Sequence, residues 1–466
     1  MRRRLPLVLT GLIGLVALFL LVQDLATGDA GPDHDPTNEA VQERPNVVVI
    51  VTDDQRARGT LRFMPHTQRL FGRRGLSFPN SFATTPMCCP SRATIFTGRY
   101  AHNHRVLKGM ATDPDFDQRA TIQYQLQNAS YKTAMFGKYL NGWNLSEDPP
   151  HFDSWAVFSQ SGDGGYYDGM WNVDGEKRRV SEYSTTFIRN RGVDFIRSHA
   201  SPDQPWLLFL STAAPHIPFT PEPRYRGADV GRPESFDPRS IDRTARTKPP
   251  FIRKFRDSQR HAESARKRQL RTLLSVDDMV ETLYAVLRET DQDRDTLMIF
   301  MSDNGYMWGE HGLTRKMFPY DGSVRVPLMI RWPGVTEGGS TDDRLAATID
   351  VAPTIYDATG VPPPEHADVD GRSLLRPWTR DRLLLEYWRT HGRPSWSALR
   401  TRGRLYVEYR REKSNKIWAR ELYDLRSDPR ELKNLLHDPG PAAKRHAARL
   451  KKRLARDRTC SGVSCP

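Results

Sequence analysis

The stretch NVVVIVT, residues 46–52, decides the fold of this chain, because it is apolar, β-branched and uninterrupted. Such a run is typical of a strand that is buried on both faces of a sheet. It stops at Asp53 and Asp54, where two carboxylates follow without a spacer. Open α/β sheets bind ligands at the edge where their strands end, so this pair is the first indication of a site.

Further apolar runs continue this pattern along the chain. They predict strands at residues 131–136, 205–211, 296–302 and 327–332. Apolar residues at helical spacing between Leu273 and Leu287 predict an amphipathic core helix. The alternation of strands and helices predicts an α/β fold, with a largely parallel central sheet flanked by helices.

Polar residues follow these strands at their C-terminal ends, as the two carboxylates follow the first one. Because parallel strands end at the same edge of a sheet, we expect these side chains to meet in one crevice. The set comprises Asp53, Asp54, Lys138, His216, Asp303 and Asn304.

The character of the sequence changes after residue 375. Short strand-like runs follow without long helices between them, at residues 383–387, 396–400, 405–409 and 422–425. A basic helix is expected near residues 442–456. We therefore predict a main domain at residues 46–375 and, at residues 376–466, a C-terminal subdomain with a small antiparallel sheet.

Residues 1–30 have the order of an export signal, with three arginines at positions 2–4 ahead of an apolar stretch at 5–22. This stretch is long for a cleaved signal peptide and just long enough to span a bilayer, so a signal peptide and an N-terminal membrane anchor both fit. Residues 31–45 form a polar linker. We expect an exported protein, either extracellular or membrane-anchored and facing outward.

The chain has 4 cysteines. Cys460 and Cys465 enclose four residues at the C-terminus, and in an exported chain this spacing predicts a small disulfide loop. Such a short loop constrains little of the unfolded chain, so it would fix the tail and not the fold. Cys88 and Cys89 are adjacent and poorly placed to bridge each other.

The net charge of +14 is concentrated in two segments. Residues 243–271 contain 11 Lys or Arg against two acids, and residues 444–458 contain 8 against one. Two basic segments on an otherwise balanced protein indicate a polyanionic partner, such as a sulfated polysaccharide or an anionic lipid. Export and the lack of a nucleic-acid-binding motif argue against nucleic acid. Solvated helix faces are the alternative explanation.

The strand-end residues also predict a metal site. Asp53, Asp54, Asp303 and Asn304 offer only oxygen ligands, which suit Ca²⁺ or Mg²⁺ and not Zn²⁺. Three carboxylates in one crevice would repel one another and an anionic substrate unless a cation balanced them. The alternative is that these residues are ordinary turns at strand ends.

The most specific motif is CCPSRATIFTGR, residues 88–99. It fits Cys-x-Pro-Ser-Arg followed, after three residues, by an apolar residue and Thr-Gly-Arg, and so resembles the signature of sulfatases that use formylglycine. Pro90 suits the first turn of a helix, so a helix is expected after Cys88. The alternative is a turn into a buried helix in which Cys88 is a small apolar residue.

Other motifs carry the same resemblance from about residue 46 to the end of the chain. They are VTDDQ at 51–55, FGKYLN at 136–141, LSVDD at 274–278, SDNGY at 302–306, RVPL at 325–328 and CSGVSC at 460–465. The chain is similar to type I sulfatases of the alkaline phosphatase superfamily, and within them to the N-acetylglucosamine-6-sulfatases and extracellular heparan 6-O-endosulfatases. This implies an alkaline phosphatase-like fold in which residues 46–375 are the catalytic domain.

The resemblance implies that Cys88 is oxidised to formylglycine (3-oxoalanine) by a formylglycine-generating enzyme during maturation. The hydrated aldehyde would attack the sulfur of a sulfate ester and expel the alcohol. Arg92 would hold the hydrate, and Lys138 and Lys316 would hold the sulfate. The implied ligands of Ca²⁺, with Mg²⁺ as the alternative ion, are Asp53, Asp54, Asp303, Asn304 and the modified Cys88.

Histidines near these motifs are candidates for the acid that protonates the leaving alcohol, because His titrates near neutrality. His216 is the first candidate, since it follows a predicted strand. His311, within Gly-Glu-His-Gly at residues 309–312, is the second. His102 and His104, just after the signature, are weaker candidates. For each of them, a hydrogen-bonded structural histidine is the alternative.

Two positions depart from the family pattern. Leu140 stands where many sulfatases have a histidine, and Met307 stands where the glucosamine subgroup often has one. The first leaves open which residue helps to eliminate sulfate. The second weakens the assignment to glucosamine 6-sulfate.

The sequence thus favours a sulfuric ester hydrolase that acts on a sulfated glycan, with 6-O-sulfated N-acetylglucosamine as the leading substrate. A phosphodiester or phosphonate ester hydrolase on the same fold is one alternative. A non-catalytic, polyanion-binding surface protein is the other.

Overall fold

The computed structural model describes residues 44–109, 116–159, 165–201, 203–231, 246–255, 257–411, 414 and 416–466. The segment predicted as a signal peptide or anchor, and most of the linker, lie outside this part of the chain. No helix within the described ranges combines the length and apolar character needed to cross a bilayer.

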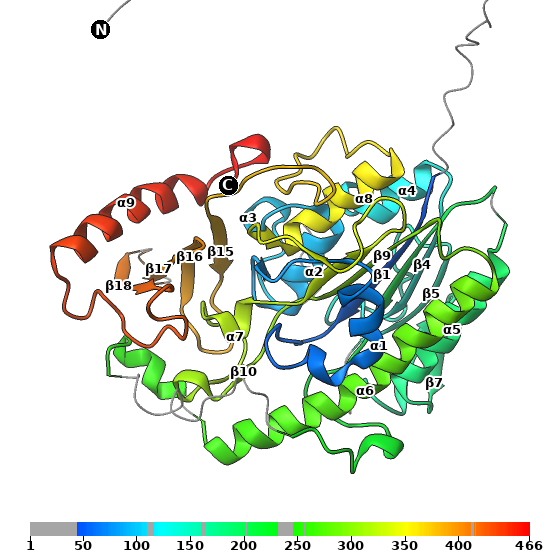
Figure 1. Ribbon diagram of the computed structural model, residues 1–466, viewed down its shortest axis with the longest axis horizontal. Helices are drawn as coiled ribbons and strands as arrows, with labels where there is room; N and C mark the ends of the chain where they lie inside the picture. Colours follow the sequence, from blue (N-terminus) through cyan, green and yellow to red (C-terminus); the bar gives the residue numbers. More distant parts are fainter. Residues whose placement is uncertain are drawn as a thin grey trace, which may run out of the picture. The chain divides into compact units, whose positions relative to one another are not determined.

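A ten-stranded sheet forms the centre of the described chain (Figure 1). Across the sheet its strands are β13 (Ser340–Thr341), β2 (Leu76–Ser77), β12 (Leu328–Arg331), β9 (Thr296–Ser302), β1 (Asn46–Thr52), β8 (Trp206–Ser211), β4 (Lys132–Gly137), β5 (Ser154–Phe158), β6 (Gly169–Val173) and β7 (Glu176–Val180). The central strands β9, β1, β8, β4 and β5 are parallel, which confirms the predicted α/β fold.

Towards both edges the sheet becomes antiparallel, although the outermost pair β13 and β2 is parallel. β12 runs against β9 on one side, and β6 and β7 run against their neighbours on the other. The sequence predicted a strand at residues 327–332 but not its direction. Direction depends on how the chain returns to the sheet, which the apolar run itself does not encode.

Alternate residues of β1 face two separate layers of helices. Val48 and Ile50 belong to a core with α5 (Ser184–Ser198) and α6 (Gln259–Glu289). Val47, Val49 and Val51 belong to a core on the opposite face. The helices there are α2 (Cys88–Thr97), α4 (Ile122–Asn128) and α8 (Val351–Thr359). The strand is therefore buried on both faces, as its sequence predicts.

A separate four-stranded antiparallel sheet follows in the C-terminal part of the chain. Its strands are β15 (Leu383–Tyr387), β16 (Ser395–Arg400), β17 (Arg404–Arg410) and β18 (Ile417–Asp424). The helix α9 (Pro441–Asp457) lies beside it and buries Leu450 and Leu454 (Figure 1). This small sheet confirms the predicted C-terminal architecture; the domain boundary at residue 375 stays a prediction.

Shorter elements connect these layers. The helices are α1 (Pro65–Thr67), α3 (Ala101–His104) and α7 (Asp321–Val324). The strands are β3 (Ser81–Phe82), β10 (Met307–Trp308), β11 (Thr314–Arg315) and β14 (Ala346–Ala347). A 3-10 helix at Pro250–Phe255 leads towards α6.

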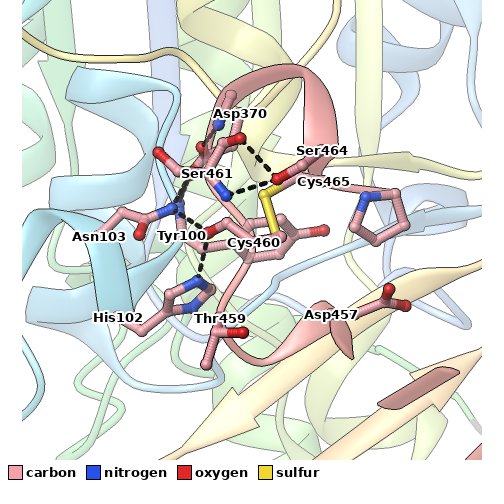
Figure 2. Close-up of a disulfide and its surroundings, with 12 residues drawn as sticks. Tyr100, His102, Asn103, Asp370, Asp457, Thr459, Cys460, Ser461, Ser464 and Cys465 are labelled. Atoms are coloured by element: carbon pink, nitrogen blue, oxygen red, sulfur yellow. Dashed lines mark hydrogen bonds between the residues drawn. A yellow bond between two sulfur atoms is a disulfide. The ribbon is translucent and has the colours of Figure 1, made fainter. Parts of the chain in front are cut away.

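The C-terminal tail is attached to α3 beside a disulfide between Cys460 and Cys465 (Figure 2). The carbonyl oxygen of Cys460 lies 2.9 Å from His102 Nε2 and accepts from Asn103 Nδ2 at 2.9 Å. Asp370 accepts from the backbone N–H of Gly462 at 2.7 Å. The loop therefore fixes the tail against the main fold close to the signature helix α2.

Candidate active site

The C-terminal ends of the central strands meet at one edge of the sheet. Asp303 follows β9 and donates its backbone N–H to the carbonyl of Thr52, at the end of β1, at 3.1 Å. Lys138 follows β4 and donates its backbone N–H to Ser211, at the end of β8, at 2.8 Å. The parallel register thus brings together residues that lie far apart in sequence.

Gly137 makes the approach between β4 and β8 possible. Its φ is +113°, and a Cβ at this position would lie 1.9 Å from the carbonyl oxygen of Ser211. Any other residue would force the two strand ends apart, because that contact is with backbone. The glycine before Lys138 therefore holds the lysine at the crevice.

Cys88 is the first residue of α2 and is 1% exposed. Its Sγ lies 3.5 Å from Asp53 Oδ1 and 2.6 Å from Lys316 Nζ. The residue before it, Met87, is extended, so the helix begins at the crevice edge. The N-terminus of a helix favours negative charge, and here it adds to the charge of Lys316.

Each carboxylate of the crevice has a cation beside it. Lys138 Nζ pairs with Asp53, and Lys316 Nζ pairs with Asp54. The Nε of Arg92 donates to Asp303 Oδ2 at 2.9 Å. These six side chains are all buried. Such a dense set of opposite charges fixes the position of each member, because no water competes for it.

Ser211 is a member of this network that the sequence analysis did not identify as a site residue. Its hydroxyl accepts a hydrogen bond from Arg92, whose guanidinium also donates to the carbonyl of Lys138 at 2.6 Å. Ser211 lies at the end of a strand, like the acidic residues. The strand-end rule would have found it if hydroxyls had been considered as positioning groups.

The charges are not fully balanced at Asp303. Burial and the neighbouring Asp53 raise the pKa of Asp303 to about 6, although Arg92 opposes them. Burial would also raise the pKa of Asp53, but Lys138, His216 and Lys316 hold it below its usual range. The pKa of Asp303 is thus raised although Arg92 lies beside it, and a cation bound near these carboxylates would lower it again.

Asn304 fits a metal ligand by a separate observation. Its Nδ2 donates to Asp54 Oδ1 at 2.6 Å and to the carbonyl of Gly305 at 3.0 Å. Its Oδ1 is buried and, among the described residues, has no hydrogen-bond donor. A buried amide oxygen without a donor is costly unless something electropositive approaches it.

One group of side chains could bind a metal ion, and it consists of Asp53, Asp54, Cys88 and His216. Their potential ligand atoms all lie within 4.8 Å of one another. Asp303 lies next to this group, since its Oδ1 accepts from the backbone N–H of Asp54 at 3.2 Å. The carboxylate and amide oxygens suit a hard cation. The cluster could therefore hold a metal ion, and the assignment of each ligand stays a prediction.

An unmodified Cys88 would be a poor nucleophile in this crevice. Burial and the charge of Asp53 raise its pKa to about 11, despite the opposing lysines. Reactive cysteines in enzymes have a lowered pKa, since the thiolate is the form that attacks. The thiol of Cys88 is therefore protonated at neutral pH, and the site does not have the electrostatics of a cysteine nucleophile.

His216 is the partly exposed member of the crevice, with 17% of its side chain accessible. Its Nε2 lies 3.9 Å from Asp54 Oδ2, and its Nδ1 lies 2.7 Å from the carbonyl of Ile217. Because a carbonyl only accepts, Nδ1 carries the proton and Nε2 faces the crevice. Burial lowers the pKa of His216, so the ring is mostly neutral at pH 7.

The structure places His311 in a second buried cluster, beside the C-terminal sheet. Its ring lies 4.5 Å from that of Tyr320, and its Nε2 lies 3.9 Å from Glu431 Oε2. Burial and Lys248 hold the pKa of His311 well below its usual value. The strand-end argument does not apply to His311, because it follows the short hairpin strand β10 and not a central strand.

The other side chains of interest are in the core or near the tail. His102 contacts Glu386, at 3.0 Å from Nδ1 to Oε1, and His104 lies 3.1 Å from the hydroxyl of Thr94. Leu140 and Met307 are buried among apolar residues. At these two positions the chain therefore has packing groups where the family pattern often has histidines.

Known families match most of the chain. The family model described as Sulfatase matches residues 45–361, and the model described as N-sulphoglucosamine sulphohydrolase, C-terminal, matches residues 309–459. The extracellular sulfatase SULF-1 homolog of Drosophila melanogaster is 34% identical over 372 residues. This alignment covers 76% of the chain and 33% of that relative, so the chain spans a third of it.

Two further proteins resemble the chain over most of both lengths. The N-acetylglucosamine-6-sulfatase of Homo sapiens is 28% identical over 490 residues, which covers 91% of the chain and 86% of that protein. A solved structure of a protein in complex with its substrate D-glucosamine-2-N,6-O-disulfate has a TM-score of 0.74. At 24% identity, covering 88% of the chain and 97% of that structure, this likeness shows the fold.

Proposed function

The chain belongs to the sulfatase family, and on that premise we propose that it hydrolyses a sulfate ester of a sugar. The observation that carries the proposal is the placement of Cys88 at the start of α2, within contact of Asp53 and Lys316. A cysteine whose pKa is about 11 in a crevice rich in cations fits a residue that is modified before it acts.

The proposed nucleophile is the hydrated aldehyde that a formylglycine-generating enzyme would form from Cys88. This group supplies an oxygen nucleophile and, in its second hydroxyl, the means to release sulfate afterwards. Lys316 is placed to stabilise negative charge at this atom, since its Nζ lies 2.6 Å from Sγ. Arg92 is fixed by its hydrogen bond to Asp303 and would hold the hydrate.

We propose Ca²⁺ as the resident cation, with Mg²⁺ as the alternative, held by Asp53, Asp54, Asp303 and Asn304. The raised pKa of Asp303 and the unsatisfied Oδ1 of Asn304 support this choice of residues. A bound cation would neutralise the carboxylates and draw charge from the oxygens of an anionic ester.

The cations of the crevice would bind the sulfate group. Lys138 and Lys316 are buried and fixed by their carboxylate partners, so they need no reorganisation when negative charge develops. Preorganised charge of this kind is often the largest single contribution to catalysis. The N-terminal N–H groups of α2 would act in the same direction.

His216 is proposed to protonate the leaving alcohol. It is the partly exposed member of the site, so it faces the direction from which a substrate arrives. Because Nδ1 carries the proton that bonds the carbonyl of Ile217, Nε2 would take up a second proton before it donates one to the alcohol. General acids of this type contribute roughly 10²- to 10⁴-fold to a rate.

The proposed substrate is 6-O-sulfated N-acetylglucosamine within a glycan. The support is the name of the human relative, together with export, which the extracellular relatives and the N-terminal sequence favour. An exported enzyme with this chemistry would meet sulfated glycans outside the cell. Either the signal peptide or the membrane anchor is compatible with this location.

Mass spectrometry of the peptide that ends at Arg92 tests the chemistry at Cys88. We expect the aldehyde, or its hydrate, in protein purified from the native host, together with release of sulfate from N-acetylglucosamine 6-sulfate. An unmodified thiol in fully active enzyme would refute the proposed nucleophile. Faster turnover of an aryl phosphate or phosphonate than of the matched aryl sulfate would instead assign the protein to phosphorus esters. Glycan binding without any turnover would make it a polyanion-binding protein.

A further inference from the structure

A second hollow lies on the C-terminal sheet and is not part of the crevice around Cys88. Its volume is about 560 Å³, which is within the range of small-ligand sites. The cationic and aromatic groups that line it include Lys254, Arg389, Arg410, Arg411, Phe251 and Trp418. Among the described residues that line it, none is acidic. We call it the C-terminal groove.

Trp418 gives the groove an apolar face that is open to solvent. It is 40% exposed, and it is the only aromatic residue among the exposed large hydrophobic side chains of the described chain. The ring of Phe251 lies 4.5 Å from it, and the guanidinium of Arg411 lies 5.9 Å from its centre. An exposed aromatic ring that contacts a second ring and has a cation beside it suits a ligand with both an apolar face and a negative charge.

Arg410 lines the groove, and its guanidinium is only partly satisfied by hydrogen bonds within the described residues. Its guanidinium donates to the hydroxyl of Ser397, and its Nε is buried with no acceptor among the described residues. Burial and the nearby Arg458 lower the pKa of Arg410 to about 10, although Glu386 and Glu408 oppose this. A bound anion would pair with the guanidinium and offset its repulsion by Arg458.

The groove adjoins a smaller hollow, with which it shares three arginines. The smaller hollow, of about 210 Å³, shares Arg389, Arg410 and Arg411 with the groove and is also lined by Lys108, Trp396 and the acidic Glu386. Trp396 Nε1 donates to the carbonyl of Met317 at 3.0 Å. Met317 directly follows Lys316, which contacts Cys88. Trp396, which lines the smaller hollow, thus contacts the segment that carries Lys316.

We infer that the C-terminal groove binds an additional sulfated or carboxylated sugar unit of the glycan whose sulfate ester is cleaved at Cys88. The ring of Trp418 would pack against the apolar face of the sugar. The guanidiniums of Arg410 and Arg411 would bind its anionic group, for which their planar geometry is well suited. The inference rests on the proposed function for the position of the cleaved unit, but the groove itself can be tested by binding.

The test compares the full chain with a variant carrying Arg411→Ala and Trp418→Ala, both exposed positions. The matched control carries Arg179→Ala, an exposed position on β7, and Met170→Ala, which is 44% exposed on β6. It also removes one cation and one exposed apolar side chain. The probe is a heparin-derived hexasaccharide, titrated calorimetrically at about 0.15 M ionic strength, where long-range attraction is screened.

We expect the groove variant to weaken hexasaccharide binding roughly tenfold, and the control variant to leave it unchanged. The KM for the hexasaccharide should rise by a similar factor, whereas kcat/KM for N-acetylglucosamine 6-sulfate should not change. Equal binding by the groove variant, or an equal loss in the control, would overturn the inference. So would an equally groove-dependent affinity for single-stranded DNA of the same charge. If no ester is turned over but binding still requires Arg411 and Trp418, the proposed function fails and the groove stands.

Discussion

Two buried clusters of charge in this protein differ in how completely their polar groups are satisfied. The first is the Cys88 cluster, defined by Asp53, Asp54, Cys88, Asp303, Asn304 and Lys316. The second is the Glu421 cluster, defined by Lys248, Tyr320, Tyr409, Glu421 and Tyr423. In the second, Glu421 accepts hydrogen bonds from three tyrosine hydroxyls at 2.7 to 3.0 Å.

The ammonium group of Lys248, the lysine of the Glu421 cluster, also has several partners. The Nζ of Lys248 donates to Tyr423 at 2.8 Å and to the carbonyl of Glu431 at 3.0 Å, and it lies 3.8 Å from the centre of the Tyr320 ring. In the Cys88 cluster, by contrast, Asn304 Oδ1 has no donor among the described residues. The neighbouring His216 is partly open to solvent.

This difference distinguishes a cluster that stabilises the fold from a cluster that can bind a ligand. A buried charge that is satisfied on every side holds two parts of a fold together but has nothing left to offer a ligand. A buried charge beside an unsatisfied atom and an open edge costs stability, and such arrangements occur where function requires them. The predictions below test this separation, because activity and stability should respond to different clusters.

The largest expected effect is loss of activity in Cys88→Ala. Removing the proposed nucleophile should lower kcat by at least about a thousandfold, since in the proposed mechanism the remaining residues only bind and polarise the ester. The measurement is initial rate on an aryl sulfate. Cys89→Ala, one residue along and also buried, serves as the control and should keep its activity. Comparable loss in both variants would indicate damage to α2 and not removal of a nucleophile.

Metal removal should have the next largest effect. Chelation followed by dialysis should reduce kcat/KM roughly a hundredfold, because the carboxylates would then face the substrate without neutralisation. Added Ca²⁺ should restore the rate, with Mg²⁺ as the comparison ion. Full activity in metal-free protein, verified by elemental analysis, would exclude the proposed role of Asp303 and Asn304 as ligands.

In the Glu421 cluster, Glu421→Gln should affect stability and not catalysis. Three hydroxyls would lose their common charged acceptor and Lys248 its neighbouring charge, so we expect the free energy of unfolding to fall by about 3 kcal/mol. The measurement is the denaturant midpoint at constant slope. The exposed Glu337→Gln is the matched control. A loss of kcat well below the unfolding transition would contradict the distinction between the two clusters.

The smallest effect is expected at His102, which binds the C-terminal tail (Figure 2). Burial lowers the pKa of His102, but Glu386 and the carbonyl of Cys460 outweigh burial and raise it above its usual value. A raised pKa in the folded state stabilises below about pH 6.5, and this contribution disappears as pH rises through the folded value. His102→Gln should therefore cost about 1 kcal/mol at pH 6 and less at pH 9. A cost that is independent of pH would refute the charged form.

Much of the fold was predictable from local pattern. The apolar runs gave β1 and β9 their observed bounds, because a strand buried on both faces must be continuously apolar. The parallel direction of these strands then placed Asp53 and Asp303 at one edge. The reversed direction of β12 could not be predicted, since it depends on packing against β9 and β2.

The sequence by itself determined the candidate residues for the proposed chemistry: the signature that begins at Cys88, the carboxylates at the strand ends and the lysine after Gly137. These are local patterns, and local chain geometry constrains them directly. Only the tertiary structure decided that Ser211 holds Arg92, that Asn304 Oδ1 lacks a donor, and that His311 belongs beside Glu431 and Tyr320. The physical reason is that hydrogen bonding and burial depend on segments far apart in sequence, which meet only when the sheets and helices have packed.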